Sequence, residues 1–276
     1  MTERIALGLS YSGGRYYGWQ RQTDTLTVQT EVETALSKMS GEAIACVPAG
    51  RTDRGVHALN QVVHFDTHKM RAEEIWQRGL NAHLPLDIRV QWVKKVQPDF
   101  HARFSATERH YRYLILNQPV SSPILQDFVT WYPYKLDCEK MQQGALYLIG
   151  EHDFSAFRDA HCQSKSPIRK MKEILISQQD DLIQFDVRAN AFLHHMVRNI
   201  VGTLLMVGRQ KQSPEWVKSV LAAKDRRQAG ITAPARGLYF YDVTYDDIHA
   251  LPTKTSQSLL LPSNILGNLA KERFMS

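Results

Sequence analysis

Cysteine is scarce in this chain. Its 276 residues include three, Cys46, Cys138 and Cys162, and no two of them form a C-x-x-C pair. Thiols this scattered argue against a zinc knuckle and against a disulfide framework. They suit a reducing compartment, so we expect a cytoplasmic protein.

Long apolar runs are missing as well. No stretch approaches the roughly 20 residues that a membrane-spanning helix needs, and residues 1–4 lead directly into a strand-like segment instead of a signal sequence. We therefore expect a soluble protein with no membrane partner. Hydrophobic residues still make up 43% of the chain, which is enough for the core of one large domain or two ordinary ones.

Acidic residues are outnumbered by basic ones, 28 to 34, so the formal net charge is +6 and the pI is near 9.2. This excess suits an anionic partner. Composition alone favours nucleic acid only weakly, because many basic proteins bind nothing acidic.

The hydrophobic patterns predict two α+β units in succession. Strands are expected at 5–11, 61–65 and 88–96 in the first unit and at 111–117, 168–178, 182–190 and 238–243 in the second. Helices are expected from the cap Thr27 to Gly41, at 72–82, 137–149 and 192–207, and after Ser213. We therefore predict an N-terminal half at 1–107, a C-terminal half at 108–249 and a loosely packed tail at 250–276. The two sheets are expected to join, with helices on one face and a cleft between the halves.

Asp53 is the carboxylate most suggestive of chemistry. It lies between Arg51 and Arg54, within a run bounded by Gly50 and Gly55, directly before a predicted strand. A nearby guanidinium keeps a carboxylate ionised, which suits a nucleophile or base better than an acid. Taken alone, the same run also fits a polar turn in which Asp53 caps an amide.

Three segments combine aromatic rings with cations, at 15–22, 100–113 and 190–202. Rings stack on bases and arginines pair with phosphates, so this mixture suits single-stranded RNA, although Tyr and Trp are also common in cores. In the third segment Arg198 interrupts an apolar helix and needs a carboxylate partner. His194 and His195 would point about 100° apart on that helix, and no further ligand stands at zinc spacing, so we predict no metal site.

Together these motifs resemble the TruA-type tRNA pseudouridine synthases. The similarity extends from residue 11 to about residue 245, and its most specific motifs lie at 16–22, 50–53, 100–106, 150–154, 194–202 and 237–239. Two positions depart from the family pattern. Ser12 stands where the family usually has Asp, and Arg54 stands where it has a small residue.

The resemblance implies an enzyme that isomerises uridine to pseudouridine at positions 38, 39 and 40 in the anticodon stem-loop of tRNAs. It implies that the reaction needs no cofactor and no metal, and that the protein is a homodimer. With the sequence patterns, it predicts an α+β fold of two similar α/β-sandwich (ferredoxin-like) halves. Their mostly antiparallel sheets join around a basic RNA-binding cleft.

The resemblance also assigns roles to residues. Asp53 matches the catalytic aspartate, Arg51 is placed to assist it, and Arg198 matches the arginine that pairs with it. Tyr111 matches the ring that stacks on the target base and could help shuttle a proton, and Leu238 matches an apolar residue lining the pocket. Whether Asp53 attacks C1′, promotes a glycal or adds at C6 stays open.

A basic run at 158–172 holds five Lys or Arg against one Asp. We expect it to be a mobile arm whose Arg158, Lys165 and Arg169 meet phosphates, with a solvated loop as the alternative. Three other functions compete with the synthase hypothesis. They are a non-catalytic RNA-binding module, a hydrolase, for which the sequence offers no metal ligands or Ser/His/Asp set at recognisable spacing, and a related synthase with another tRNA target.

Overall fold

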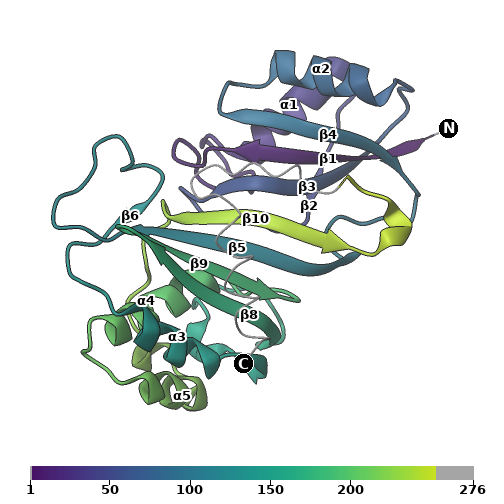
Figure 1. Ribbon diagram of the computed structural model, residues 1–276. Coiled ribbons are helices and arrows are strands. Elements are labelled where there is room, and N and C mark those ends of the chain that lie inside the picture. The colour runs from purple at the N-terminus through teal and green to yellow at the C-terminus, as the bar shows by residue number, and fades with distance from the viewer. Residues whose placement is uncertain (1, 253–276) are drawn as a thin grey trace, which may run out of the picture.

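The computed structural model describes residues 2–252, so most of the predicted tail, from residue 253 on, lies outside the described residues. Within that range the chain is a mixed α/β protein built on a ten-stranded, mostly antiparallel sheet (Figure 1). The strands are β1 (Glu3–Tyr11), β2 (Val47–Pro48), β3 (His57–Thr67), β4 (Ile88–Val96), β5 (Ala106–Leu116), β6 (Thr130–Trp131), β7 (Gly150–Asp153), β8 (Ile168–Gln179), β9 (Leu182–Ala189) and β10 (Leu238–Tyr245). The helices are α1 (Val28–Ser40), α2 (Glu73–His83), α3 (Cys138–Leu146), α4 (Met196–Gly208) and α5 (Pro214–Ala223), with 3₁₀ turns η1 (Ser155–Phe157), η2 (Arg226–Gln228) and η3 (Asp247–His249).

The last strand, β10, joins the N-terminal and C-terminal groups of strands in the middle of the sheet. The order is β4-β1-β3-β10-β5-β9-β8-β7, with β2 paired to β3 and β6 to β5. β10 is parallel to β3 and antiparallel to β5, so Tyr239 faces His57 on one side and Arg112 on the other. The chain that follows the Asp53 loop therefore lies beside the strand that begins at Leu238.

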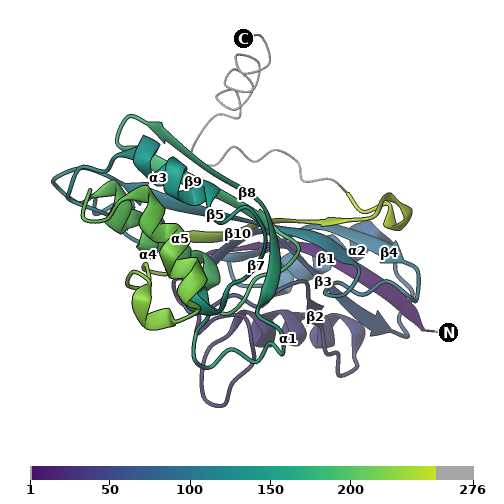
Figure 2. The same ribbon diagram turned by 90° about the horizontal axis from the view of Figure 1, so that it is seen from below.

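Helices accompany both groups of strands. α1 and α2 pack together beside the N-terminal strands, and α3, α4 and α5 gather beside the C-terminal strands (Figures 1 and 2). Along β5, Tyr111, Tyr113 and Ile115 enter the main core, whereas Leu114 and Leu116 enter a smaller cluster with Val129 and Tyr239. This alternation buries β5 on both faces, and each fully buried large apolar side chain contributes roughly 1.5–3 kcal/mol.

The predicted caps of α1 and α3 are confirmed. The Thr27 hydroxyl accepts a hydrogen bond from Thr30 N, and Gly41 ends α1 with φ of 74°. Asp137 accepts one from Lys140 N at 3.0 Å. No described helix is long and apolar enough to cross a membrane.

Two helix boundaries were predicted wrongly. The helix expected at 137–149 ends at Leu146, because the chain turns into β7 at Gly150, whose φ is 109°. The helix expected at 192–207 begins only at Met196, because His195 adopts a left-handed conformation with φ of 61°. His194 and His195 therefore precede the helix, and the 100° argument against a shared direction does not apply to them.

Candidate active site

A cleft of about 1080 Å³ opens where the β2–β3 loop, β5, the 161–169 segment and the start of α4 meet. Among the described residues, six arginines line it, namely Arg51, Arg54, Arg103, Arg109, Arg169 and Arg198. Asp53 is the one carboxylate in that lining. The cleft therefore attracts anions and places a single negative group inside a positive field.

Buried groups hold the Asp53 loop in place. Trp19 N donates to Thr52 O at 3.0 Å, and the Tyr11 hydroxyl is 2.8 Å from Thr52 Oγ1. Gly18 has φ of 94°, and a Cβ there would lie 2.7 Å from Thr52 O. Only glycine allows this approach, which explains the motif around Trp19: it supports the Asp53 loop.

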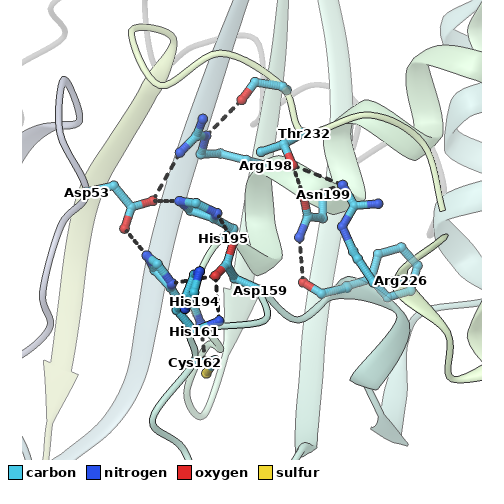
Figure 3. Close-up of polar contacts among 12 residues, drawn as sticks. Asp53, Asp159, His161, Cys162, His194, His195, Arg198, Asn199, Arg226 and Thr232 are labelled. Carbon is cyan, nitrogen blue, oxygen red and sulfur yellow. Dashed lines mark hydrogen bonds and ion pairs between the residues drawn. The ribbon is translucent and has the colours of Figure 1, made fainter.

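Three charged or titratable groups surround the Asp53 carboxylate (Figure 3). Arg198 Nη1 lies 3.3 Å from Oδ2, His194 Nε2 lies 3.1 Å from Oδ1 and His195 Nε2 lies 3.3 Å from Oδ2. Burial by itself raises the pKa of Asp53, but the His194 hydrogen bond and the charges of His195 and Arg198 outweigh it and lower the pKa. With 21% of its side chain exposed, Asp53 is an ionised and reachable carboxylate at neutral pH.

Arg198 is aimed at Asp53 by the backbone. Its Nε donates to Ala233 O at 2.8 Å, which fixes the guanidinium plane while Nη1 reaches the carboxylate. The carboxylate partner expected for Arg198 is thus present, although its part in the reaction stays a prediction.

Asp159 is a second carboxylate at the site, on the far side of the two histidines from Asp53, and sequence reasoning missed it. Its Oδ2 lies 2.7 Å from His195 Nδ1 and its Oδ1 lies 3.4 Å from His194 Nδ1. The two imidazoles stack with centroids 4.0 Å apart, each between Asp53 and Asp159 (Figure 3). The Asp53 hydrogen bond raises the pKa of His194, while burial lowers the pKa of His195. The left-handed backbone at His195 costs of order 1–3 kcal/mol, a strain typical of functional sites.

Tyr111 and Leu238 also line the cleft. The Tyr111 ring meets Phe192 and Phe240 edge-on, with centroids 4.9 and 5.2 Å apart. Burial, with the nearby Asp53 charge, raises the pKa of Tyr111, so its hydroxyl is protonated at neutral pH. The structure thus brings the ring and the apolar residue of the expected site together with Asp53.

The predicted basic residues are divided between the cleft and its surroundings. Arg51 is exposed at the cleft, where Nη1 donates to Gln163 Oε1 at 3.3 Å. Arg169 also lines it, whereas Arg158 and Lys165 do not.

Arg158 is tied to its own loop. Its Nη2 donates to Cys162 O at 2.7 Å and to Ser164 O at 2.8 Å. Arg169 Nη2 donates to Ser164 Oγ at 2.7 Å. These guanidiniums therefore organise the loop, and phosphate contact by Arg158 or Arg169 stays a prediction.

The aromatic run near the N-terminus is mostly core. Tyr16 and Trp19 are buried, whereas Tyr17 is 44% exposed and lines the cleft. Arg54 lies over the Tyr17 ring at 4.2 Å from its centroid. Of these three rings, only Tyr17 is exposed in the cleft, and Arg54 covers one of its faces.

An ionised carboxylate held by arginine in an arginine-lined cleft defines an enzyme site for an anionic substrate. The family described as tRNA pseudouridine synthase matches residues 9–105 and 145–246. The chain is 53% identical over 258 residues to tRNA pseudouridine synthase A of Colwellia psychrerythraea, covering 94% of this chain and 100% of that protein. It is 51% identical over 262 residues to the protein of the same name from Vibrio campbellii, covering 95% of this chain and 99% of that one. The chain therefore belongs to the tRNA pseudouridine synthase family, a family of isomerases, as its motifs predicted.

Proposed function

We propose that this protein isomerises uridine to pseudouridine at positions 38, 39 and 40 of the tRNA anticodon stem-loop, with Asp53 as the reacting carboxylate. The observation that carries the proposal is the position of Asp53. It is the one acid among the described residues lining a cleft that holds six arginines. Membership of the family supplies the substrate class.

The reaction breaks the N1–C1′ bond and forms a C5–C1′ bond, while a proton leaves C5 and N1 gains one. No oxidant or reductant is needed, and we expect no cofactor or metal. Attack on C1′, glycal formation and addition at C6 all begin from an ionised carboxylate, which the surroundings of Asp53 favour. Arg198 would keep that charge in place.

The target base must first leave its stack, which costs a few kcal/mol. We propose that Tyr111 stacks on the displaced base, that Leu238 forms an apolar wall of the pocket, and that Arg51 assists at the entrance. The common position of all three in the lining of the cleft supports this assignment.

Phosphates would be met by the basic residues around the cleft. We assign Arg51, Arg158, Lys165 and Arg169 to this role, with Arg158 also holding its loop. Each phosphate neutralised by these side chains adds about 0.7–0.9 to the negative slope of log affinity against log salt.

The strand order supports two similar halves, 1–107 and 108–249. The first half follows the path β1-α1-β2-β3-α2-β4. The second follows β5-α3-β8-β9-α4-β10 once the short strands β6 and β7 and the helix α5 are set aside as additions. The pairing orders β4-β1-β3-β2 and β10-β5-β9-β8 correspond position by position. We propose that each half is a ferredoxin-like unit. We further propose a cytoplasmic homodimer, in which one subunit holds the tRNA body while the other acts on the base.

Release of tritium from tRNA labelled at uridine C5 tests the function. The purified protein should release it with no added metal, and Asp53→Asn should abolish release while leaving tRNA affinity largely intact. Asp181→Asn, at the exposed tip of the β8–β9 hairpin, is the matched control and should behave as wild type. Tight tRNA binding by wild type with no release would instead identify a non-catalytic RNA-binding module.

A further inference from the structure

Asp53, His194 and His195 converge on one point. Each offers one ligand atom, and the three atoms lie within 4.8 Å of one another. Both imidazoles turn Nε2 toward Asp53 and Nδ1 toward Asp159. Two histidines and one carboxylate facing each other form a ligand set used by Zn²⁺ and related divalent ions.

The spacing of these atoms suits a small tetrahedral cation. With metal–ligand bonds of about 2.0–2.1 Å, neighbouring ligand atoms in a tetrahedron lie about 3.3 Å apart. His194 Nε2 lies 3.1 Å from Asp53 Oδ1 and His195 Nε2 lies 3.3 Å from Asp53 Oδ2, so each histidine meets one oxygen of the carboxylate. With one oxygen taken as the ligand, the three ligand atoms lie within 4.8 Å of one another and would draw closer around a bound ion. Three protein ligands would leave a fourth position for water on the side of the cleft.

The position of Asp159 is a second, independent indication of a metal site. Histidines that bind a metal almost always donate their other ring N–H to a carboxylate, carbonyl or water, which fixes the tautomer. Here one carboxylate lies within 3.4 Å of Nδ1 of both histidines. A proton on each Nδ1 leaves the Nε2 lone pairs directed at Asp53, where the cation would lie.

Arg198 opposes a cation at this place, because its guanidinium lies 3.3 Å from Asp53 Oδ2. The Asp159 charge offsets it. With neutral histidines, the two carboxylates and Arg198 sum to one negative charge, so a divalent ion changes the local sum to one positive charge. A local charge of one positive unit does not prevent binding at a site that is only partly shielded from water and salt.

We propose that Asp53, His194 and His195 bind one Zn²⁺ and that the bound ion blocks the enzyme by occupying the carboxylate. The ion binds to the Nε2 lone pair of each neutral histidine, a doubly protonated ring first releases its Nε2 proton to solvent, and no redox step is involved. The blocking part of this proposal rests on the proposed function, whereas the binding part does not.

Metal binding is measured first on the full-length protein without tRNA, after treatment with EDTA and its removal. Titration with Zn²⁺ in a calorimeter should give one site per chain, and Co²⁺ should give the intense visible absorption of tetrahedral nitrogen and oxygen ligands. Asp159→Asn should weaken binding about 10- to 100-fold, and His195→Ala should weaken it further. His161→Ala, a neighbouring cleft histidine outside the ligand set, should change nothing.

Two results would overturn the proposal. One is a Zn²⁺ affinity that His195→Ala and Asp159→Asn leave unchanged. The other is loss of binding in Cys162→Ala, because the Cys162 thiol also lies beside His194 and would then be the true ligand. His195→Ala should retain its circular dichroism spectrum, which separates lost ligation from misfolding.

Tritium release is measured second, with and without Zn²⁺. Zn²⁺ should inhibit wild type, EDTA should restore it, and Asp159→Asn should need a higher Zn²⁺ concentration by the same factor as its loss of affinity. Zn²⁺ binding without any tritium release, even in EDTA, would refute the proposed function and leave the metal site standing. Tritium release with no Zn²⁺ binding would refute the metal site and leave the proposed function standing.

Discussion

Replacing Gly202 with alanine tests how Arg198 is aimed at Asp53. Gly202 lies in α4, and a Cβ there would lie 1.7 Å from Ile231 O, far below the 3.0 Å that real Cβ contacts respect. The 230–233 segment would therefore have to retreat by about 1 Å or more. Because the atom that is hit belongs to the backbone, no side-chain rotation relieves the clash.

The same segment carries the anchor of Arg198. Ala233 O accepts from Arg198 Nε at 2.8 Å, and Ala233 N donates to Arg198 O at 3.1 Å. Overpacking alone costs about 1–3 kcal/mol, and losing a hydrogen bond from a charged group costs about 1.5–3 kcal/mol. We expect Gly202→Ala to lower the free energy of unfolding by roughly 2.5–6 kcal/mol, the sum of these two costs. Since a 1 Å misplacement can cost about 100-fold, we expect it to reduce kcat by about that factor.

Urea unfolding and initial rates of tritium release at saturating tRNA measure the two effects separately. Gly14→Ala is the control, because its Cβ would meet nothing within 4 Å and its φ is not positive. A variant that loses stability but keeps kcat within twofold would show that the Ala233 anchor does not aim Arg198. A variant whose free energy of unfolding and kcat both equal those of wild type would refute the predicted clash between residue 202 and Ile231 O.

Three further predictions concern single side chains. Arg198→Met should lower kcat/KM by roughly 30- to 150-fold, the equivalent of about 2–3 kcal/mol for a truncated, partly buried charge pair. Arg198→Lys keeps the positive charge and should recover part of the lost kcat/KM. An equal loss in both variants would show that the positive charge at position 198 does not account for the effect. Tyr111→Phe should keep tRNA affinity and lower kcat by about 100-fold or more if its hydroxyl moves a proton, whereas an unchanged kcat leaves only stacking. Burial, then His101, lowers the pKa of His64 from 6.5 to about 4, and its Nδ1 accepts from Ala102 N at 3.1 Å. Its stabilising contribution is therefore complete above pH 6.5 and is lost as the pH falls toward 4, by about 1–2 kcal/mol after solvent screening. Urea midpoints of wild type and His64→Gln should show that difference in pH dependence, and parallel curves would contradict it.

Local rules were enough for most elements of the fold. Thr27 and Gly41 bound α1 as predicted because a cap hydroxyl and a left-handed glycine act on their immediate neighbours. The alternation of Tyr111, Tyr113 and their neighbours predicted β5 because it reflects which side chains reach the core. Strand pairing was beyond such rules, since nothing local to Leu238 indicates that β10 inserts between β3 and β5.

In the candidate site, too, some contacts were predictable from the sequence and others were not. The apolar helix pattern predicted that Arg198 needs a carboxylate partner, and the family resemblance identified that partner as Asp53. Their 3.3 Å contact fits both. The place of the two histidines was missed because the apolar pattern of α4 continues back through them. The left-handed turn at His195 that separates them from the helix is sustained by Asp159, 36 residues earlier.

That turn also explains why the site needs two separate segments of the second half of the chain, the loop at Asp159 and the start of α4. Adjacent residues of a helix point about 100° apart, whereas the break before Met196 lets the Nε2 atoms of both His194 and His195 reach the Asp53 carboxylate. The break is strained, and the ionic contacts of Asp159 are among the interactions that offset its cost. Asp159 in turn is placed by its backbone N–H, which donates to His194 O at 3.1 Å. The loop and the helix start therefore fix each other, and Asp53, on a loop that Trp19 and Tyr11 support independently, meets a preformed partner.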